Sequence, residues 1–180
     1  MEFLPPGKTR VEKKMNSNPQ YPEPSLHFFC GKMAAGKSTL ARELAESVDA
    51  VLISEDQWLA RLFPESIHTF QDYLTCSARL KRILSEHVKD LLRSGVTVVM
   101  DFPGNTKSQR SWFKSLARDA GVPHVLHFLD RSNAECLVQL KKRNKERPFG
   151  SKVTSPEEFM SITSFFEAPS LEEGFTLQQH

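Results

Sequence analysis

The sequence predicts an α/β fold in which a mostly parallel sheet carries helices on both of its faces. The first observation is that short apolar segments of strand type alternate with longer segments whose apolar residues recur at helical spacing. The second is that residues 96–100 are almost continuously apolar, as in a strand that is buried on both sides. With 180 residues, the chain is long enough for one such domain with a core on each face of the sheet.

Strands and helices are expected to alternate from residue 26 onward. The expected strands are residues 26–30, 51–54, 96–100 and 124–129. The expected helices are residues 37–49, 70–93, 107–120, a helix from Ser132 to about residue 144, and a last helix that begins at Ser155. Residues 55–67 contain Pro64 and are expected to form a short helical turn and a loop. Ser132 and Ser155 are suited to cap helices, and Gly95 and Gly121 to end them.

Residues 1–24 differ from the rest of the chain because they are rich in proline and lack periodicity, so we expect a loose extension and a single domain at residues 25–180. The extension lacks the apolar core of a signal peptide, and no segment approaches the roughly 20 apolar residues of a membrane span. Three cysteines without metal-ligand spacing suggest a cytoplasmic protein with reduced thiols and no membrane partner. The formal net charge of +2 provides no strong field for nucleic acid.

The most specific motif runs from Gly31 to Ser38 and spells G-x-x-x-x-G-K-[ST], the phosphate-binding loop of nucleotide-using enzymes. An expected strand precedes it and an expected helix follows, which predicts the three-layer P-loop NTPase fold. Backbone N–H groups of the loop can surround the phosphates of ATP, Lys37 can bind the β- and γ-phosphates, and the Ser38 hydroxyl can bind Mg²⁺. We expect the Lys37 ammonium to have no structural partner other than the phosphates. The predicted ATP-binding residues here are Gly31, Ala34, Ala35, Gly36, Lys37, Ser38 and Thr39.

Acidic side chains follow the second and third expected strands. Because ligands of open α/β sheets bind beyond the carboxyl ends of the strands, Asp56 and Asp101 are expected to converge near the loop. A kinase needs one carboxylate to accept the proton of the attacking hydroxyl and another to hold Mg²⁺ or its waters. We assign Asp56 as the base, with Glu55 as the alternative, and Asp101 together with Ser38 as metal ligands. The competing interpretation is that these carboxylates cap helices or face solvent.

Two arginines, Arg143 and Arg147, lie four residues apart near the end of an expected helix and share one face if that helix continues. The Pro-Phe-Gly sequence at residues 148–150 interrupts it and predicts a lid at about residues 143–155. Guanidinium groups that arrive as the lid closes would stabilise the charge that develops on the γ-phosphate, so both arginines are expected to bind ATP and to act in catalysis. The alternative is a solvated basic helix end.

Four stretches together resemble a known family, namely residues 31–39, 53–56, 101–105 and 142–147. Over residues 26–167 the chain resembles small P-loop kinases of the AAA-type ATP-binding group, which include the kinase domain of phage polynucleotide kinase, zeta toxins and chloramphenicol phosphotransferase. The resemblance implies that Asp56 is the general base and that Asp101 orients substrate or metal. It also implies that the two arginines bind the ATP phosphates and that residues 165–175 lie near the adenine.

Two positions depart from the polynucleotide kinase pattern. Leu59 occupies the place of a substrate-holding arginine, and Gln139 stands where relatives often have an arginine. Both differences argue against a polynucleotide acceptor, so the preferred function is an ATP-dependent phosphotransferase acting on a hydroxyl of a small molecule or nucleotide. The alternatives are an ATP-binding regulatory module without transfer activity and a 5′-hydroxyl polynucleotide kinase.

Other side chains are weaker candidates. Trp58 lies two residues after the predicted base and is the best aromatic candidate for the acceptor pocket. Arg110 and Lys107 either contact an anionic acceptor or form a solvated helix face. His124 and His127 alternate with apolar residues and are expected to be buried or at a sheet edge rather than catalytic.

Overall fold

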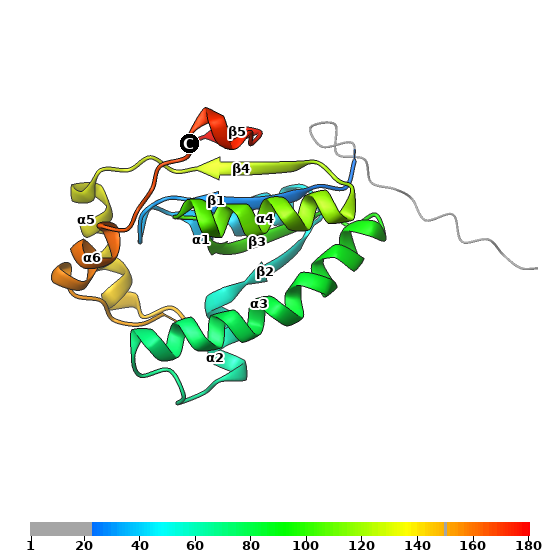
Figure 1. Ribbon diagram of the computed structural model, residues 1–180. Helices are drawn as coiled ribbons and strands as arrows, with labels where there is room; N and C mark the ends of the chain where they lie inside the picture. Colours follow the sequence, from blue (N-terminus) through cyan, green and yellow to red (C-terminus); the bar gives the residue numbers. More distant parts are fainter. Residues whose placement is uncertain (1–22, 150) are drawn as a thin grey trace, which may run out of the picture.

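Five parallel strands form one sheet in the computed structural model, which describes residues 23–149 and 151–180 (Figure 1). The strands are β1 (Leu26–Cys30), β2 (Val51–Ser54), β3 (Val98–Pro103), β4 (His124–Phe128) and β5 (Leu177–Gln179), in the spatial order β2-β3-β1-β4-β5. The helices are α1 (Lys37–Ser47), α2 (Glu55–Leu62), α3 (Phe70–Arg93), α4 (Lys107–Ala120), α5 (Asn133–Glu146) and α6 (Pro156–Thr163), with a short 3₁₀ helix at Leu171–Glu173. Almost all of the extension predicted at residues 1–24 lies outside the described residues.

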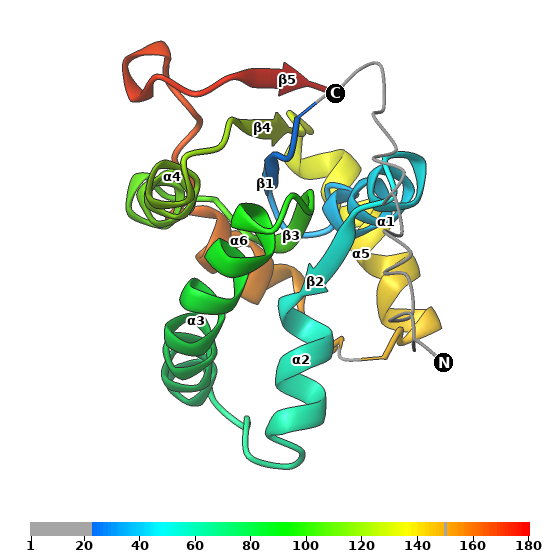
Figure 2. The same ribbon diagram turned by 90° about the vertical axis from the view of Figure 1, so that its right-hand side faces the viewer.

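The sheet separates two apolar layers because successive strand residues point to opposite faces. In β1, Phe28 packs with α3 and α4, and its ring stacks on Phe113 with a centroid distance of 4.4 Å. The next residue, Phe29, packs on the other face with α1, α5 and α6. Figure 2 shows α3 and α4 on one side of the strands and α1 and α5 on the other. The predicted α/β fold, with a parallel sheet covered on both faces, is therefore confirmed.

Several predicted boundaries are wrong. The third strand begins at Val98 and continues to Pro103, so Asp101 lies within β3 and not after it. Residues 55–62 form a two-turn helix, α2, which is longer than the short helical turn expected at the start of residues 55–67. The fifth strand was missed because its sequence, Leu-Gln-Gln, carries only one apolar residue and no alternation. The caps at Ser132 and Ser155 are confirmed, since each hydroxyl accepts the backbone N–H three residues later.

Within the described residues, no helix is long and apolar enough to cross a membrane. The three cysteines Cys30, Cys76 and Cys136 are buried as free thiols.

A chain of imidazoles crosses β1, β4 and the end of β5. The His27 ring is hydrogen-bonded to the Ser25 hydroxyl at 2.9 Å and to the His127 ring at 3.0 Å, and His127 is bonded in turn to His180 at 3.0 Å. His27 and His127 are buried, as predicted for His127. Burial lowers the pKa of His27 to about 4 and that of His127 to about 3, so both imidazoles are neutral in the folded protein near pH 7.

This imidazole chain is expected to destabilise the fold at acid pH. Below pH 6.5 the unfolded chain protonates both imidazoles while the folded protein does not, so stability that is complete above pH 6.5 is lost as the pH falls toward 4. At pH 5 each imidazole is expected to reduce the free energy of unfolding by about 2 kcal/mol. Urea denaturation at pH 7.5 and pH 5 measures this loss. The double variant His27→Gln, His127→Gln should lose much less between the two pH values, and an equal loss in both proteins would contradict the explanation.

Candidate functional site

The loop between β1 and α1 has the backbone shape of a phosphate-binding loop. Gly36 is the N-cap of α1 with φ 101°, and Ala34 also has positive φ, at 60°. Gly36 has no side chain with which to cap the helix, and of the first three N–H groups of α1 that of Thr39 donates to the Gly36 carbonyl at 3.1 Å, so an anion can approach the start of the helix. A Cβ atom at Gly31 would lie 2.9 Å from the carbonyl oxygen of Leu129, so this position needs glycine. The predicted loop therefore has the conformation that phosphate binding requires.

The Lys37 ammonium lies inside this loop. It donates to the carbonyl oxygens of Gly31 at 2.6 Å and Lys32 at 2.8 Å, so the expectation that it has no partner other than phosphate is wrong. Burial lowers the pKa of Lys37, and the carboxylate of Asp101 opposes that decrease. The two carbonyl bonds hold the ammonium at the loop, where a nucleotide phosphate would compete for it.

Asp101 lies beside the loop because β3 is adjacent to both β1 and β2. The Ser38 hydroxyl donates to Asp101 Oδ1 at 3.2 Å, and the Ser54 hydroxyl donates to Oδ2 at 3.3 Å. The strand register places Ser54 directly opposite Asp101. An oxygen pair from Ser38 and Asp101 suits Mg²⁺, which uses one or two protein oxygens and completes its shell with waters and phosphate oxygens. Among the described residues there is no cluster of three or more His, Cys, Asp or Glu side chains that could hold a metal ion.

Asp56 lies in the first turn of α2, which starts where β2 ends. Its carboxylate accepts from Arg143 of α5 at 3.3 Å. Burial raises the pKa of Asp56 to about 6; Arg143 opposes this rise and the carboxylate of Asp101 adds to it. The side chain is still 51% exposed, so an acceptor or water can reach the carboxylate. Asp56 thus has the accessibility and the pKa that a general base needs.

Glu55 does not fit the alternative role of base. The residue is only 1% exposed, and both carboxylate oxygens are occupied by hydroxyl donors from α3. Tyr73 donates to Oε2 at 2.7 Å and Ser77 donates to Oε1 at 2.5 Å. An acceptor outside the protein has no access to this carboxylate.

The two arginines that were expected to act together differ in position. Arg143 is in α5 and only 30% of its side chain is exposed, whereas α5 ends at Glu146 and Arg147 is its exposed C-cap residue with φ 46°. The two side chains therefore do not share one helical face. Two hydrogen bonds join the end of α5 to Thr154: the Asn144 amide donates to the Thr154 carbonyl at 2.7 Å and accepts from the Thr154 N–H at 3.2 Å.

Asn105 contributes to the site although we assigned it no role from the sequence. Its side-chain oxygen accepts from the backbone N–H of Gly31 at 3.0 Å and so links the end of β3 to the phosphate-binding loop. The residue before it, Gly104, lies close to the backbone of β1, since a Cβ atom at Gly104 would lie 2.7 Å from the carbonyl oxygen of Phe29. The available signal was a polar residue directly after Pro-Gly at the end of a strand.

Two further candidates, Arg110 and Trp58, lie outside the chemistry suggested for them. Arg110 is fully buried and bonds Glu173, so it contacts neither an acceptor nor solvent. Trp58 is two positions from Asp56 on α2, and at about 100° per residue the two side chains project toward opposite sides of the helix.

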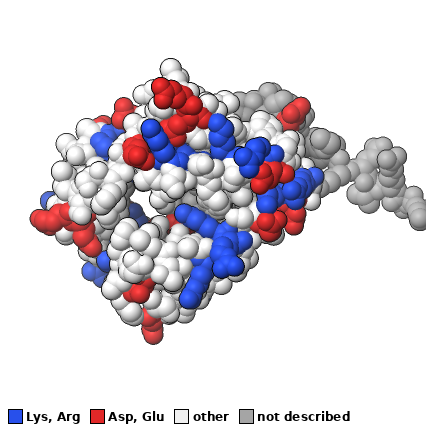
Figure 3. Space-filling model, viewed as in Figure 1, with Lys and Arg blue, Asp and Glu red and all other residues white. Residues whose placement is uncertain are grey.

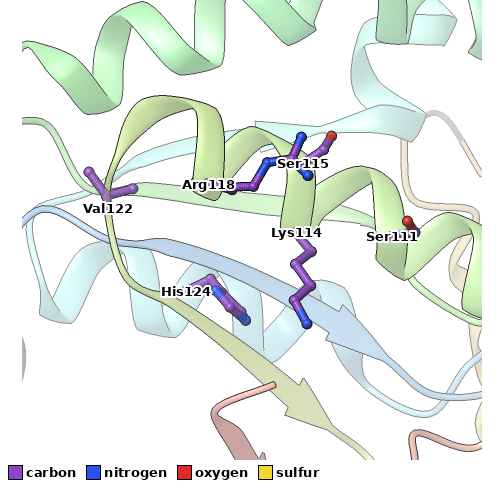
Figure 4. Close-up of a pocket in the computed structure, with 6 residues that line it drawn as sticks. All are labelled: Ser111, Lys114, Ser115, Arg118, Val122 and His124. Carbon is purple, nitrogen blue, oxygen red and sulfur yellow. The ribbon is translucent and has the colours of Figure 1, made fainter. Parts of the chain in front are cut away.

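A cavity of about 290 Å³ lies against α4 and β4. Figure 4 shows Lys114 and His124 pointing toward the same side of α4, while Arg118 points away from them. The lining residues are Ser111, Lys114, Ser115, Arg118, Val122 and His124, and none of them is a predicted site residue. This cavity is separate from the loop, and we assign the candidate site to the convergence of Lys37, Asp101, Asp56 and Arg143.

Lys37→Ala is expected to weaken ATP·Mg²⁺ binding by about 100-fold or more, because the phosphates lose a charge-assisted contact. The variant is expected to stay folded, since removing a desolvated ammonium offsets the loss of its two carbonyl bonds. Calorimetric unfolding with and without ATP·Mg²⁺ measures both effects. At a nucleotide concentration 100 times Kd, the parent should gain about 2.7 kcal/mol, most of which the variant should lack.

The matched control for this measurement is Lys32→Ala. Lys32 lies in the same loop and its ammonium also donates to a backbone carbonyl, that of Arg131, at 3.0 Å. This variant should keep the stabilisation by nucleotide. Equal stabilisation of the parent and Lys37→Ala would contradict the role of Lys37.

Comparison with known proteins identifies a matching family model and solved structures of similar fold. A family model described as an AAA domain matches residues 26–169. Among curated proteins, no match was found. A solved structure of a candidate kinase from Chloroflexus aurantiacus is 20% identical, with a TM-score of 0.69 over 87% of each chain. The APS kinase CysC of Mycobacterium tuberculosis, in complex with AMPPNP and APS, is 19% identical, with a TM-score of 0.55 over 70% of this chain and 73% of that one. A chain of the Pnkp1/Rnl/Hen1 RNA repair complex is 18% identical, with a TM-score of 0.63 over 79% of this chain and 43% of that one. At these identities the likenesses establish the fold.

Proposed function

Because the chain belongs to the AAA domain family, we propose that it is a P-loop kinase that transfers the γ-phosphoryl group of ATP·Mg²⁺ to a hydroxyl of a small molecule or nucleotide. The observation that carries this proposal is the Asp56–Arg143 pair, which lies within electrostatic reach of both Lys37 and Asp101. A module that only binds nucleotide needs the loop and a metal ligand. It does not need an accessible carboxylate with a raised pKa opposite an arginine.

Each of these side chains has a distinct task in the transfer. The Asp56 carboxylate, mostly ionised at pH 7, accepts the proton of the acceptor hydroxyl while the oxygen of that hydroxyl forms a bond to the γ-phosphorus. The bond from the γ-phosphorus to the β–γ bridging oxygen breaks, and ADP leaves. Lys37 and Arg143 stabilise the negative charge that spreads over the phosphoryl oxygens. Ser38 and Asp101 would hold Mg²⁺, which neutralises charge on the β- and γ-phosphates when it is bound.

Similar structures support nucleotide and acceptor binding in this fold. The APS kinase structure contains AMPPNP, a non-hydrolysable ATP analogue, together with the acceptor APS. A polynucleotide acceptor is a second candidate because α3 exposes Arg79 and Arg82, and Figure 3 shows Lys and Arg side chains gathered over α3. Charges of both signs intermingle over the rest of that face.

The test is incubation of the protein with γ-labelled ATP, Mg²⁺ and a panel of acceptors. The panel comprises nucleosides, antibiotics, nucleotide sugars and 5′-hydroxyl oligonucleotides. A labelled product that requires Lys37 supports the proposal, and the arm in which it forms identifies the acceptor class. Tight ATP binding with no transfer to any acceptor would instead favour a regulatory module.

A further inference from the structure

Glu55 is the most deeply buried carboxylate in the described part of the chain, and the transfer mechanism above does not use it. It is 1% exposed and lies in the first turn of α2, directly before Asp56. Its two carboxylate oxygens accept separately from Tyr73 and Ser77 of α3, at 2.7 Å and 2.5 Å. The position at the N-terminus of α2 adds a favourable interaction with the helix dipole.

The two hydroxyl donors match this carboxylate because they are four residues apart on α3 and so lie on one face of the helix. Burying a carboxylate is costly unless its oxygens accept hydrogen bonds, and a hydroxyl that loses its acceptor inside the protein is also unfavourable. Both hydrogen bonds to Glu55 can therefore form only when the first turn of α2 has one position along α3 and one rotation about its own axis. Burial and the neighbouring Glu55 carboxylate raise the pKa of Tyr73, so the phenol remains a donor.

We propose that Glu55, Tyr73 and Ser77 position the general base, which makes Glu55 a positioning residue and not a catalytic one. This inference rests on the proposed kinase function. Asp56 follows Glu55 on the same helical turn, so the rotation that keeps Glu55 on α3 also directs Asp56 toward Arg143 at 3.3 Å. A rotation of α2 would move Asp56 away from Arg143 and from the γ-phosphate.

Alternative anchors for this turn are weak. Helix α2 has only two turns, and its N-cap Ser54 makes no side-chain cap, because the Ser54 hydroxyl donates to Asp101. The buried apolar residue of α2, Leu59, lies a full turn further along the helix. Apolar packing at Leu59 leaves rotation of the first turn comparatively unrestrained, since packing is less directional than hydrogen bonds to a carboxylate.

The experiment compares the parent with the double variant Tyr73→Phe, Ser77→Ala. With γ-labelled ATP·Mg²⁺, it measures phosphoryl transfer to water and to each acceptor of the panel. Misplacement of the base is expected to lower kcat by about 10- to 100-fold. The KM for ATP should change less than about twofold, because the loop and its lysine are untouched. The single variant Glu55→Gln can still accept from one hydroxyl and donate to the other. It should therefore have a kcat closer to that of the parent than to that of the double variant.

The matched control is Ser85→Ala. Ser85 is also on α3, accepts from the indole of Trp112 at 3.0 Å, and connects α3 to α4 instead of α2. It should lower the melting temperature while leaving kcat at the parental value. A double variant with parental kcat would overturn the proposal, as would an equal loss of kcat in Ser85→Ala at a matched loss of melting temperature.

A second measurement separates this inference from the proposed function. The pKa of the Asp56 carboxyl can be read from ¹³C NMR of protein labelled at aspartate, with Asp56→Asn for assignment. It is expected near 6 in the parent and should change in the double variant, where the carboxyl moves relative to Arg143 and Asp101. If the parent transfers nothing to any acceptor, the kinase proposal fails, and this titration still tests whether Glu55, Tyr73 and Ser77 fix the position of Asp56. An unchanged pKa of Asp56 in the double variant would overturn the inference.

Discussion

Asp56→Asn is expected to lower the rate constant of phosphoryl transfer by a factor of about 10²–10⁴, the usual contribution of a general base. The amide keeps the size of the side chain and can still contact Arg143, but it cannot accept the proton of the attacking hydroxyl. ATP affinity should change little, because the loop that surrounds the phosphates does not include Asp56. Steady-state kinetics with the acceptor found in the panel, together with calorimetric titration of ATP·Mg²⁺, measure both quantities.

The matched control is Asp90→Asn, which removes an exposed carboxylate near the far end of α3, 71% exposed and paired only with Arg93 in the described residues. It should transfer phosphoryl groups at the parental rate. If Asp56→Asn were as fast as the parent, the assignment of the base would be wrong.

The pH dependence gives a second test of the same residue. Three elements besides α2 direct charged groups at Asp56: Arg143 from α5, Asp101 from β3 and Lys37 from α1, while Glu55 precedes it in α2. Burial outweighs the two cations and raises the pKa to about 6, so kcat/KM should fall as the pH drops below 6 and the base becomes protonated. In the parent this acid limb is expected near pH 6, and in Asp56→Asn it should be absent.

The sequence was sufficient for those parts of the site that depend on local chemistry and strand order. The glycine, lysine and serine spacing of the loop specifies a backbone shape that Gly36 and Ala34 adopt. The convergence of Asp56 and Asp101 was predictable because the carboxyl ends of parallel strands lie at one edge of the sheet. The pairing of Ser54 with Asp101 confirms that β2 and β3 are neighbours.

The sequence was not sufficient where a role depends on which face of a helix meets which neighbour. Glu55 and Asp56 are adjacent carboxylates of similar chemistry, and only the orientation of α2 against α3 makes one a buried anchor and the other an accessible base. The spacing of Arg143 and Arg147 predicts a shared face only if the helix continues to Arg147, whereas it ends at Glu146. Arg110 could not be distinguished from a solvated arginine because its partner Glu173 lies 63 residues away.

Arg110 fastens the C-terminal segment to the rest of the domain. Its guanidinium is fully buried and donates to both carboxylate oxygens of Glu173, each at 2.8 Å. It also donates to the carbonyl oxygens of Glu167 at 2.7 Å and Gly104 at 3.1 Å. The hydrogen bonds from Arg110 to Glu173 hold the pKa of the Glu173 carboxyl below its usual value. Beside this contact, the Glu167 N–H donates to the carbonyl of Asn105, whose side chain holds the phosphate-binding loop.

Arg110→Met is therefore expected to lower the free energy of unfolding by about 3–5 kcal/mol, because it leaves a largely buried carboxylate and two carbonyls without their donor. Urea denaturation measures the loss. Hydrogen exchange should show it first at the amide of Glu167, which bonds the β3–α4 turn, and at that of His180, which bonds β4. The control Arg118→Met removes an arginine of the same helix that pairs with Asp119 but is 75% exposed, so it should cost less than about 1 kcal/mol.

The double variant Arg110→Met, Glu173→Gln separates the two sources of that loss. Much of the cost of removing one member of a buried ion pair comes from the charge that is left behind, so neutralising Glu173 as well should restore part of the stability. The restored part measures the unpaired carboxylate, and the remainder measures the carbonyls of Gly104 and Glu167, which the second substitution does not help. If the double variant were no more stable than Arg110→Met, the charge of Glu173 would not be the cause. The contribution of Arg110 would then lie in its contacts with the backbone alone.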